Sequence, residues 1–389
     1  MKCKLADIAE FNPKESLKKG TVAKKVAMDQ LQPFCRDILS YTLEPFNGGT
    51  KFRNGDTIMA RITPCLENGK TAKVAILDDR ETGFGSTEYI VFRAKAGISD
   101  EDYLYYLICS PLVRDAAIKS MVGSSGRQRV QIDVVQNLEI DLPSITEQRK
   151  IGALLRFLDD KCQLNNKIND NLEQQAQAYF QELFVDNSDP AWTLGTVSDL
   201  GTVVGGSTPS KSKPEYYTED GIAWITPKDL SINKAKFISH GENDITELGL
   251  KNSSTSIMPE GTVLFSSRAP IGYIAIASGE VTTNQGFKSV VPKPEIGTAY
   301  VYYFLKHNLP AIEGMASGST FKEVSGSTMK NVPAVIPDIE ALACFNGFCA
   351  PIFAQQRILE EQNQSLAALR DSLLPKLMSG EIDVSGIQL

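Results

Sequence analysis

The chain of 389 residues lacks several features that mark common classes of protein. Its two histidines, His240 and His307, are too few for a histidine-rich metal site or for most histidine-dependent catalysis. Its seven cysteines are scattered without a CxxC pair, which argues against a disulfide framework or zinc ribbon and favours a reducing cytoplasm. No apolar run approaches the ~20 residues that a membrane-spanning helix needs, and the first residues lack the apolar core of a signal peptide. We therefore expect a cytoplasmic protein that does not interact with membranes.

Motifs of catalysis are also missing. Gly201–Thr208 nearly spells a phosphate-binding loop, but Ser207 stands where that loop requires a lysine to reach the phosphates. Asp189–Trp192 resembles the tetrapeptide of amino-methyltransferases, yet no glycine-rich cofactor loop precedes it. A linker is the favoured interpretation of that segment. The sequence therefore predicts no catalytic, cofactor-binding or metal-binding residue in this chain.

The formal charge of −7 argues, at first sight, against binding to nucleic acid. The charge is uneven along the chain, however. Residues 1–142 carry 20 basic and 19 acidic side chains, and residues 191–337 carry 12 and 13. The acidic excess therefore lies in the two shorter segments, 143–190 and 338–389, and each long segment remains free to present a basic face to a polyanion.

The sequence repeats itself with a period of about half its length, which predicts a tandem duplication. Tyr105-Tyr106 matches Tyr302-Tyr303 at an offset of 197 residues. Further matches in the same order are Gly123 with Gly318, Asn137 with Asn331, and the segment around Arg61 with the segment around Arg268.

Each half ends in a predicted long helix. The first, of roughly 39 residues, begins with a capping box formed by Ser144 and Glu147. Pro351 should break or kink the second helix near its start. Heptad-like spacing predicts that the two helices pack against each other, and a buried Asn165 would fix their register. The residues expected in this seam or in subunit docking are Ile151, Leu154, Leu158, Asn165, Ile168, Leu172, Leu359, Leu366, Leu369 and Leu373.

The long segments contain short strand-like runs separated by Gly, Pro and Asn, together with short helices, and predict an α+β chain with mixed domains. We expect two mixed α/β domains separated by two long antiparallel coiled-coil helices, in a twofold repeat. The expected boundaries are 1–143 and 191–337 for the domains, and 144–186 and 338–380 for the helices.

Polar loops that carry cations are the strongest functional signal. Gly123–Arg129 combines exposed backbone N–H groups, hydroxyls, two arginines and a glutamine, which are the groups that contact phosphates and base edges. Gly318–Lys322 is its counterpart, and Gly205–Tyr217 is a third basic loop. The candidate DNA-binding residues are Arg61, Ser124, Arg127, Gln128, Arg129, Ser207, Thr208, Lys211, Lys213, Arg268, Thr320 and Lys322.

The same segments carry a family resemblance. GGSTPSKSKPEYYTEDGIAWITPKDL, from Gly205, resembles the opening of a target-recognition domain in the specificity subunit of a Type I restriction–modification enzyme. SGSTFKEV, PSITEQRKIGALL and LRDSLLPKLMSGEI are similar to further signatures of that family, and the ordered set covers essentially the whole chain. The sequence departs from the pattern at EFNPKES in the first domain and at IEALACFNGFCAP at the start of the second helix.

The resemblance implies a non-catalytic subunit. It implies a bipartite double-stranded DNA target, with one half-site read by each domain and with the helices as a ruler between them. It also implies two methyltransferase subunits and two translocase–nuclease subunits as partners, in which S-adenosylmethionine, ATP and magnesium would act. Three alternatives remain open: a methylation-only system, a stand-alone DNA methyltransferase, and a coiled-coil scaffold that does not bind DNA.

Overall fold

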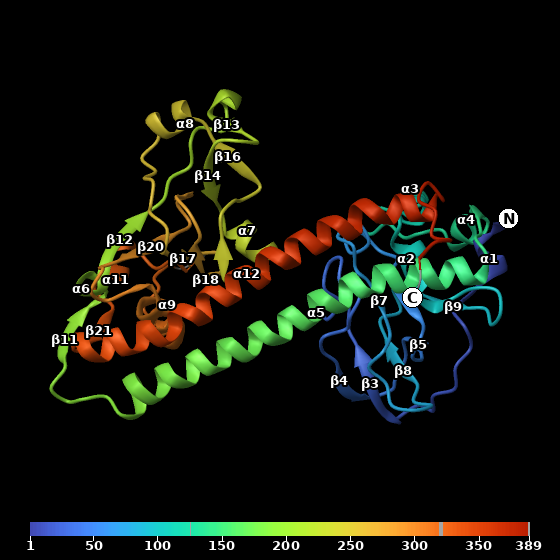
Figure 1. Cartoon of the computed structure of the whole chain (residues 1–389), viewed down its shortest axis with the longest axis horizontal. Coiled ribbons are helices and arrows are strands. Elements are labelled where there is room, and N and C mark those ends of the chain that lie inside the picture. Colours follow the sequence, from blue (N-terminus) through green and yellow to red (C-terminus); the bar gives the residue numbers. More distant parts are fainter. Residues whose placement is uncertain (125, 319–321, 388–389) are drawn as a thin grey trace. The chain divides into compact units, whose positions relative to one another are not determined.

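The structure is a computed structural model that describes residues 1–124, 126–318 and 322–387 (Figure 1). The chain forms two compact units. The first unit comprises Met1–Gln163 with Asn363–Leu389, and the second comprises Leu164–Gln362. Both boundaries fall inside long helices, so each unit contains one mixed globular domain and a part of each helix. The predicted α+β class, the two repeated domains and the two long helices are confirmed.

The first unit contains two four-stranded sheets and a two-stranded ribbon. One sheet has the order β2 (Ala9–Phe11), β9 (Tyr89–Ala94), β6 (Thr57–Ala60) and β7 (Thr71–Lys73). The other has the order β4 (Thr42–Pro45), β3 (Val22–Val26), β8 (Gly83–Gly85) and β5 (Thr50–Phe52). β1 (Lys2–Lys4) pairs with β10 (Glu139–Asp141), and the shorter helices are α1 (Leu5–Ile8), α2 (Glu101–Cys109), α3 (Pro111–Lys119) and α4 (Ile132–Gln136).

The second unit repeats this plan. A five-stranded sheet has the order β12 (Gly201–Gly205), β20 (Lys288–Pro292), β17 (Val263–Ser267), β18 (Ile271–Ala277) and β15 (Phe237–Ile238). A four-stranded sheet has the order β13 (Tyr217–Thr218), β16 (Asn243–Ile245), β14 (Ile222–Ile225) and β19 (Thr282–Thr283). β11 (Thr193–Thr196) pairs with β21 (Pro333–Ile336). The shorter helices are α6 (Val197–Leu200), α7 (Pro227–Ile232), α8 (Glu247–Lys251), α9 (Thr298–His307), α10 (Leu309–Gly314) and α11 (Gly326–Lys330), and a 3-10 turn spans Pro214–Tyr216.

Buried aromatic residues join each globular domain to its helices. Tyr105 and Tyr106 on α2 lie in the core of the first unit, and their predicted counterparts Tyr302 and Tyr303 on α9 lie in the core of the second. Burying such large side chains supplies much of the hydrophobic free energy of folding. The repeated YY pair therefore has a packing role in both units.

The two long helices are α5 (Ile145–Gln181), which continues into a π-helical turn at Glu182–Asp186, and α12 (Ile339–Met378). The predicted capping box is present, because the backbone N–H of Ser144 donates to Glu147 at 2.8 Å. α12 runs unbroken through Pro351, so the expected break there was wrong.

Side-chain contacts show that α5 and α12 run antiparallel within each unit. In the first unit Asp159 pairs with Arg370 and the Cys162 thiol donates to the Asn363 carbonyl. In the second unit the Gln356 amide donates to the Asn169 carbonyl, and Tyr179 contacts Phe348. In both cases the residue number rises along one helix as it falls along the other.

The middle of the helix seam is more polar than the sequence suggested. Ile151, Leu155 and Leu158 are buried near the start of α5, but Asn165 occupies the seam further along and is fully buried. The remaining predicted seam residues that are buried or half-buried are Leu172, Leu359, Leu366 and Leu373.

Two seam predictions require correction. Ile168 and Leu369 are 38% and 46% exposed, whereas Leu154 packs, partly buried, against the core that contains Leu155. The prediction chose the apolar member of each adjacent pair, whereas the helical repeat turns Asn169 and Arg370 toward the partner helix.

Candidate nucleic-acid interface

In the first unit, cations gather where the end of β6 meets the loop before α4. This N-terminal cluster consists of Arg61, Glu88, Arg127, Gln128 and Arg129. The Nε and Nη2 of Arg129 donate to the Glu88 carboxylate at 2.7–3.0 Å, and the Nη2 of Arg61 donates to the Val130 carbonyl at 3.2 Å. The hydrogen bonds from Arg129 lower the pKa of Glu88, so this carboxylate is ionised at neutral pH.

Backbone pairing holds the loop of the N-terminal cluster. Val122 and Arg129 exchange both backbone hydrogen bonds, and the Thr63 N–H donates to the Gln128 carbonyl at 3.0 Å. Gly123 has a φ of +138°, which a residue with a Cβ rarely adopts. Ser124 and Arg127 are exposed on this loop, and among the described residues no acidic side chain lies within ion-pair distance of Arg127. Arg127 therefore presents free donors to solvent.

In the second unit, two cations contact one carboxylate, and a third cation lies next to it in the chain. This C-terminal cluster consists of Arg268, Lys288, Lys322 and Glu323. Glu323 lies 3.5 Å from the Nη1 of Arg268 and 3.4 Å from the Nζ of Lys288. Lys322 is exposed. The predicted Thr320 lies outside the described residues.

The basic loop after β12 lies beside the same segments as the C-terminal cluster. The Ser207 N–H donates to the Thr283 carbonyl at 2.9 Å, and Thr208 hydrogen-bonds Gln285. Gly206 approaches the backbone so closely that a Cβ would lie 2.1 Å from the Asn284 carbonyl oxygen. Lys288 in turn donates to the Gln285 carbonyl at 3.4 Å, so loop and cluster form one polar surface.

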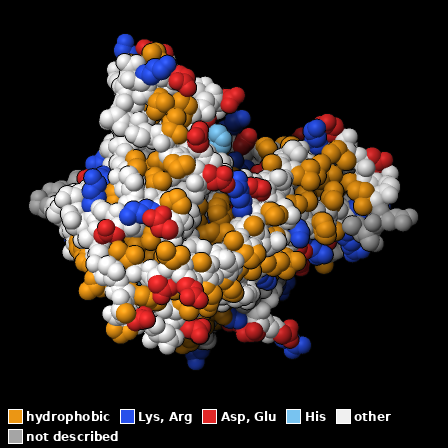
Figure 2. All heavy atoms as spheres, turned by 60° about the vertical axis from the view of Figure 1, so that its left-hand side comes forward, with side chains coloured by type: hydrophobic (Ala, Val, Ile, Leu, Met, Phe, Trp, Pro, Cys, Tyr) orange, Lys and Arg blue, Asp and Glu red, His pale blue; other side chains and the backbone are white. Residues whose placement is uncertain are grey.

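The lysines of this loop point to solvent. Lys211 is exposed, and Lys213 makes a loose pair with Glu215 at 3.7 Å, in which both side chains are about half exposed. Such a pair contributes little stability. Figure 2 shows Lys, Arg, Asp and Glu side chains interspersed over the visible face rather than segregated by sign. On this visible face, basic and acidic side chains are mixed, and no broad basic face is seen there.

The segments around Arg61 and Arg268 match as predicted, but the two arginines do not occupy the same position. The Val130 N–H donates to the Arg61 carbonyl, whereas the matching Val324 N–H donates to the carbonyl of Ser267. Arg61 therefore corresponds to Ser267, and Arg268 corresponds to Ile62. Because successive side chains of a strand point to opposite sides, the one-residue difference gives the two arginines different environments.

Sequence reasoning found most cations of these surfaces but missed three of their members. Glu88, Gln285 and Lys288 come from the segments that open β9 and β20, far along the chain from the polar loops. The strand-like run Tyr89–Phe92 was visible in the sequence. What it could not show was that backbone pairing brings Glu88 against Arg61 and Arg129.

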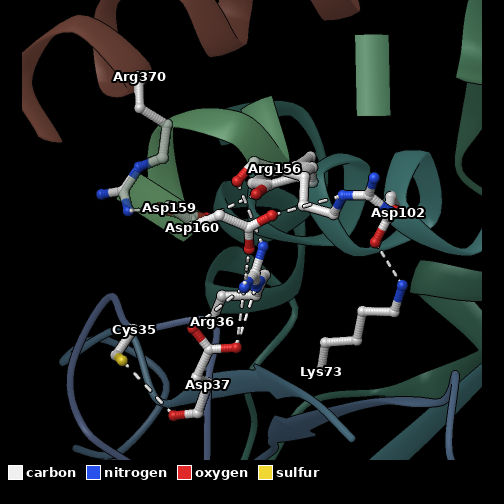
Figure 3. Close-up of polar contacts among 10 residues, drawn as sticks. Cys35, Arg36, Asp37, Lys73, Asp102, Arg156, Asp159, Asp160 and Arg370 are labelled. Atoms are coloured by element: carbon white, nitrogen blue, oxygen red, sulfur yellow. Dashed lines mark hydrogen bonds and ion pairs between the residues drawn. The ribbon is translucent and has the colours of Figure 1, made fainter. Parts of the chain in front are cut away.

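A second kind of polar site joins the globular domain of the first unit to the helices (Figure 3). Arg36 is 8% exposed, and its Nη2 lies 2.6 Å from Asp160 on α5 and 3.0 Å from Asp37. Arg370 on α12 pairs with Asp159 at 2.7 Å, and Asp159 also accepts a hydrogen bond from Tyr106. These contacts fix the domain on both helices of its own unit.

The second unit has a buried cation at the corresponding position. The Ile276 N–H donates to the Lys236 carbonyl just as the Lys73 N–H donates to the Arg36 carbonyl. The Nζ of Lys236 contacts Glu173 on α5 and lies 2.7 Å from the Gln356 Oε1 on α12. Burial alone would raise the pKa of Glu173, but Lys236 and Lys306 outweigh it and lower the pKa to about 2.

Other kinds of site find no support in the part of the chain that the structure describes. No group of three or more His, Cys, Asp or Glu side chains there is arranged to hold a metal ion. None of the helices in the described ranges is long and apolar enough to cross a membrane. All seven cysteines carry free thiols.

Two domains of one fold, each with a polar cation cluster and each packed on parts of the two long helices, form a protein with two similar candidate binding surfaces. Comparison with known proteins identifies the family. The chain belongs to the family described as Type I restriction modification DNA specificity domain, whose family model matches residues 1–174 and again 191–369. The chain is thus a DNA-recognition subunit and not a catalytic one, and such subunits act within a complex with DNA and other subunits.

Individual relatives agree with this assignment. The chain is 44% identical over 163 residues to the MjaIX specificity subunit of Methanocaldococcus jannaschii, a match that covers 41% of this chain and 38% of that relative. It is 24% identical to the HindI specificity subunit of Haemophilus influenzae, over 85% of this chain and 87% of that one. The crystal structure of a Type I S subunit from M. genitalium shares the fold, with a TM-score of 0.59 at 15% identity, over 99% of this chain and 96% of that one.

Proposed function

We propose that this chain reads a bipartite double-stranded DNA target, with one half-site bound by each globular domain. The observation that carries the proposal is the repetition of a cation cluster beside a polar loop at corresponding places in two copies of one fold. A duplicated domain that keeps cations in both copies fits a ligand with two separated binding segments.

The candidate residues fall into two roles. Lys211, Lys213, Arg61 and Arg129 are assigned to phosphate positioning, and Arg127, Gln128, Lys322 and Arg268 to base or near-base contacts. Phosphate contacts set affinity and register, whereas base-edge contacts set sequence preference. The exposure of Lys211, Arg127 and Lys322 supports their availability to DNA. The Arg61 side chain also holds the neighbouring loop through the Val130 carbonyl.

The partners we propose are two methyltransferase subunits and two translocase–nuclease subunits. S-adenosylmethionine, ATP and magnesium would act in those subunits, and the complex would work in the cytoplasm. Exposed apolar residues on the long helices offer docking faces. Phe157 is exposed on α5 in the first unit, and Leu164 and Ile168 are exposed four residues apart on α5 in the second. On α12, Leu369 is exposed in the first unit and Ile358 in the second. A methylation-only system would use the same faces without a nuclease, and a stand-alone methyltransferase is the least supported alternative.

Methylation mapping in cells that carry the whole system tests the proposal. We expect Arg127→Ala to relax one position of one half-site, and Lys322→Ala to relax one position of the other. Losing a base contact costs about 1–3 kcal/mol of discrimination. Arg80→Ala and Lys251→Ala are matched controls, because these side chains are 92% and 74% exposed and lie in the same two units. Unchanged sites and rates in both test variants would show that the assignments are wrong.

A further inference from the structure

The position held by Arg129 in the first unit is held by Glu323 in the second. Arg129 exchanges two backbone hydrogen bonds with Val122, and Glu323 exchanges the same pair with Ser317. The residues that follow, Val130 and Val324, each donate an N–H to the preceding strand end at 2.9 Å. The correspondence therefore rests on backbone pairing and does not depend on sequence similarity at these positions.

Glycines open both loops in the same way. Gly123 has a φ of +138° and Gly318 has a φ of +127°, so both loops turn through backbone conformations that favour glycine. The side chains of Arg129 and Glu323 therefore leave equivalent positions of the backbone pairing that closes each loop. Their environments can be compared directly.

The charges around this position are exchanged between the two units. In the first unit the cation Arg129 lies on the loop and its carboxylate partner Glu88 lies on the neighbouring strand segment. In the second unit the carboxylate Glu323 lies on the loop and its cationic partners are Arg268 and Lys288. Each cluster contains three cations and one carboxylate, so the overall attraction for DNA is similar while the local pattern is reversed.

A carboxylate beside bound DNA requires a compensating interaction, because phosphates repel it. Glutamate can accept a hydrogen bond from the N4 amino group of cytosine, whereas arginine donates to the O6 and N7 of guanine. Glu88 occupies the Nε and Nη2 side of the Arg129 guanidinium and leaves the Nη1 donors available. Glu323 is 36% exposed and keeps its cations at 3.4–3.5 Å, which leaves room for a further donor.

We propose that position 129/323 determines specificity and that its opposite charge gives the two half-sites different bases at corresponding places. Arg129 would favour guanine, and Glu323 would favour cytosine. The proposal rests on the function proposed above and adds one base preference per domain, and it moves Arg129 from the phosphate contacts assigned there to a base contact. Glu88 is then a positioning residue that acts through Arg129.

The test uses the assembled complex with wild-type chain, Arg129→Gln or Glu323→Gln, and reads both the methylated motif in cells and the binding of duplexes substituted at each motif position. We expect each variant to lose about 5- to 150-fold of its discrimination at one position of one half-site, since a specific base contact contributes about 1–3 kcal/mol. Glutamine should shift the accepted base toward adenine. The other half-site should stay unchanged.

Arg80→Gln and Glu247→Gln are controls of the same chemistry on exposed side chains of the same units, and should change neither motif nor unfolding temperature. A wild-type complex that methylates no bipartite site would overturn the proposed function itself. A normal wild-type motif that both variants retain, with weaker binding to all sequences, would overturn only the specificity role. Complete loss of methylation together with a lower unfolding temperature would assign both residues to folding and would also overturn it.

Discussion

Glu173 on α5 is the carboxylate through which several side chains of the second unit are joined to the long helices. It accepts from Lys306 at 2.6 Å and contacts Lys236, and Tyr303 donates to it at 2.9 Å. Lys236 is 8% exposed. Removing one partner of a buried pair leaves an uncompensated charge, which costs more than the pair contributes.

We expect Glu173→Gln to destabilise the second unit by about 3–5 kcal/mol at pH 7. The pKa of Glu173 in the folded chain, about 2, lies below its ordinary value of 4.5. The ionised carboxylate therefore stabilises the fold fully above pH 4.5, and this contribution falls as the pH drops from 4.5 toward 2. Urea unfolding of wild type and variant at pH 7 and pH 4 should show a smaller difference at pH 4.

Glu313→Gln is the control for this experiment, because Glu313 is exposed and lies in the same unit. It should unfold as wild type does at both pH values. A difference between Glu173→Gln and wild type that grows toward pH 4 would contradict the assigned direction of the pKa shift.

At the scale of single residues, the sequence predicted the type of functional side chain better than it predicted which side chains contact each other. The loop cations Arg127, Arg129 and Lys322 follow from residue type beside Gly, Ser and Thr. Their carboxylate partners do not, because Glu88 lies about 40 residues away in the chain and is brought to Arg129 by strand pairing. The segments around Arg61 and Arg268 do match, but the sequence could not show that the two arginines are offset by one residue, since only backbone hydrogen bonds fix which residue faces which.

The long helices show a similar division at the scale of elements. Their existence, their length and the Ser144 cap were predictable, because they depend on local spacing and local hydrogen bonds. Which side of each helix faces the other helix was predictable only where the seam residues are apolar. Near Asn169 and Arg370 the seam is polar, and the choice of apolar neighbours put Ile168 and Leu369 on the wrong face.

Arg370 provides the test of this polar seam. Its guanidinium lies 2.7 Å from the carboxylate of Asp159, a residue that is 7% exposed. The same carboxylate accepts a hydrogen bond from the Tyr106 hydroxyl at 2.6 Å. We expect Arg370→Met to destabilise the first unit by about 3–5 kcal/mol, because Asp159 would remain buried without its cation. Arg80→Met, at a 92% exposed side chain, should change stability by less than about 0.5 kcal/mol. Equal unfolding free energies for the two variants would show that the seam tolerates an apolar residue at 370.

The whole chain has an acidic excess, yet the two cation clusters lie outside the segments that contain it. Residues 143–190 and 338–389 include both long helices and the excess of acidic over basic side chains. Affinity for DNA depends on the cations that meet phosphates rather than on net charge. A formal charge of −7 is therefore compatible with DNA recognition by the two domains.

The helices also suggest how the spacing between half-sites is set. α5 and α12 have 37 and 40 residues, and each contributes to both units. If they act as the ruler between domains, seven residues inserted in both, after Gln163 and after Gln362, would add about 10 Å. Seven residues make nearly two full turns, so the seam would keep its faces within about 20°.

We expect methylation mapping of this double insertion to show a nonspecific spacer longer by about three base pairs, with both half-sites unchanged, since base pairs rise by about 3.4 Å each. The insertion in α5 alone is the matched control. The single insertion would put the antiparallel contacts of one unit out of register. Gln356 could then no longer reach Asn169 while Arg370 reaches Asp159. Methylation should therefore be lost. A double insertion that methylates the original spacer would show that the helices do not set the separation of the half-sites.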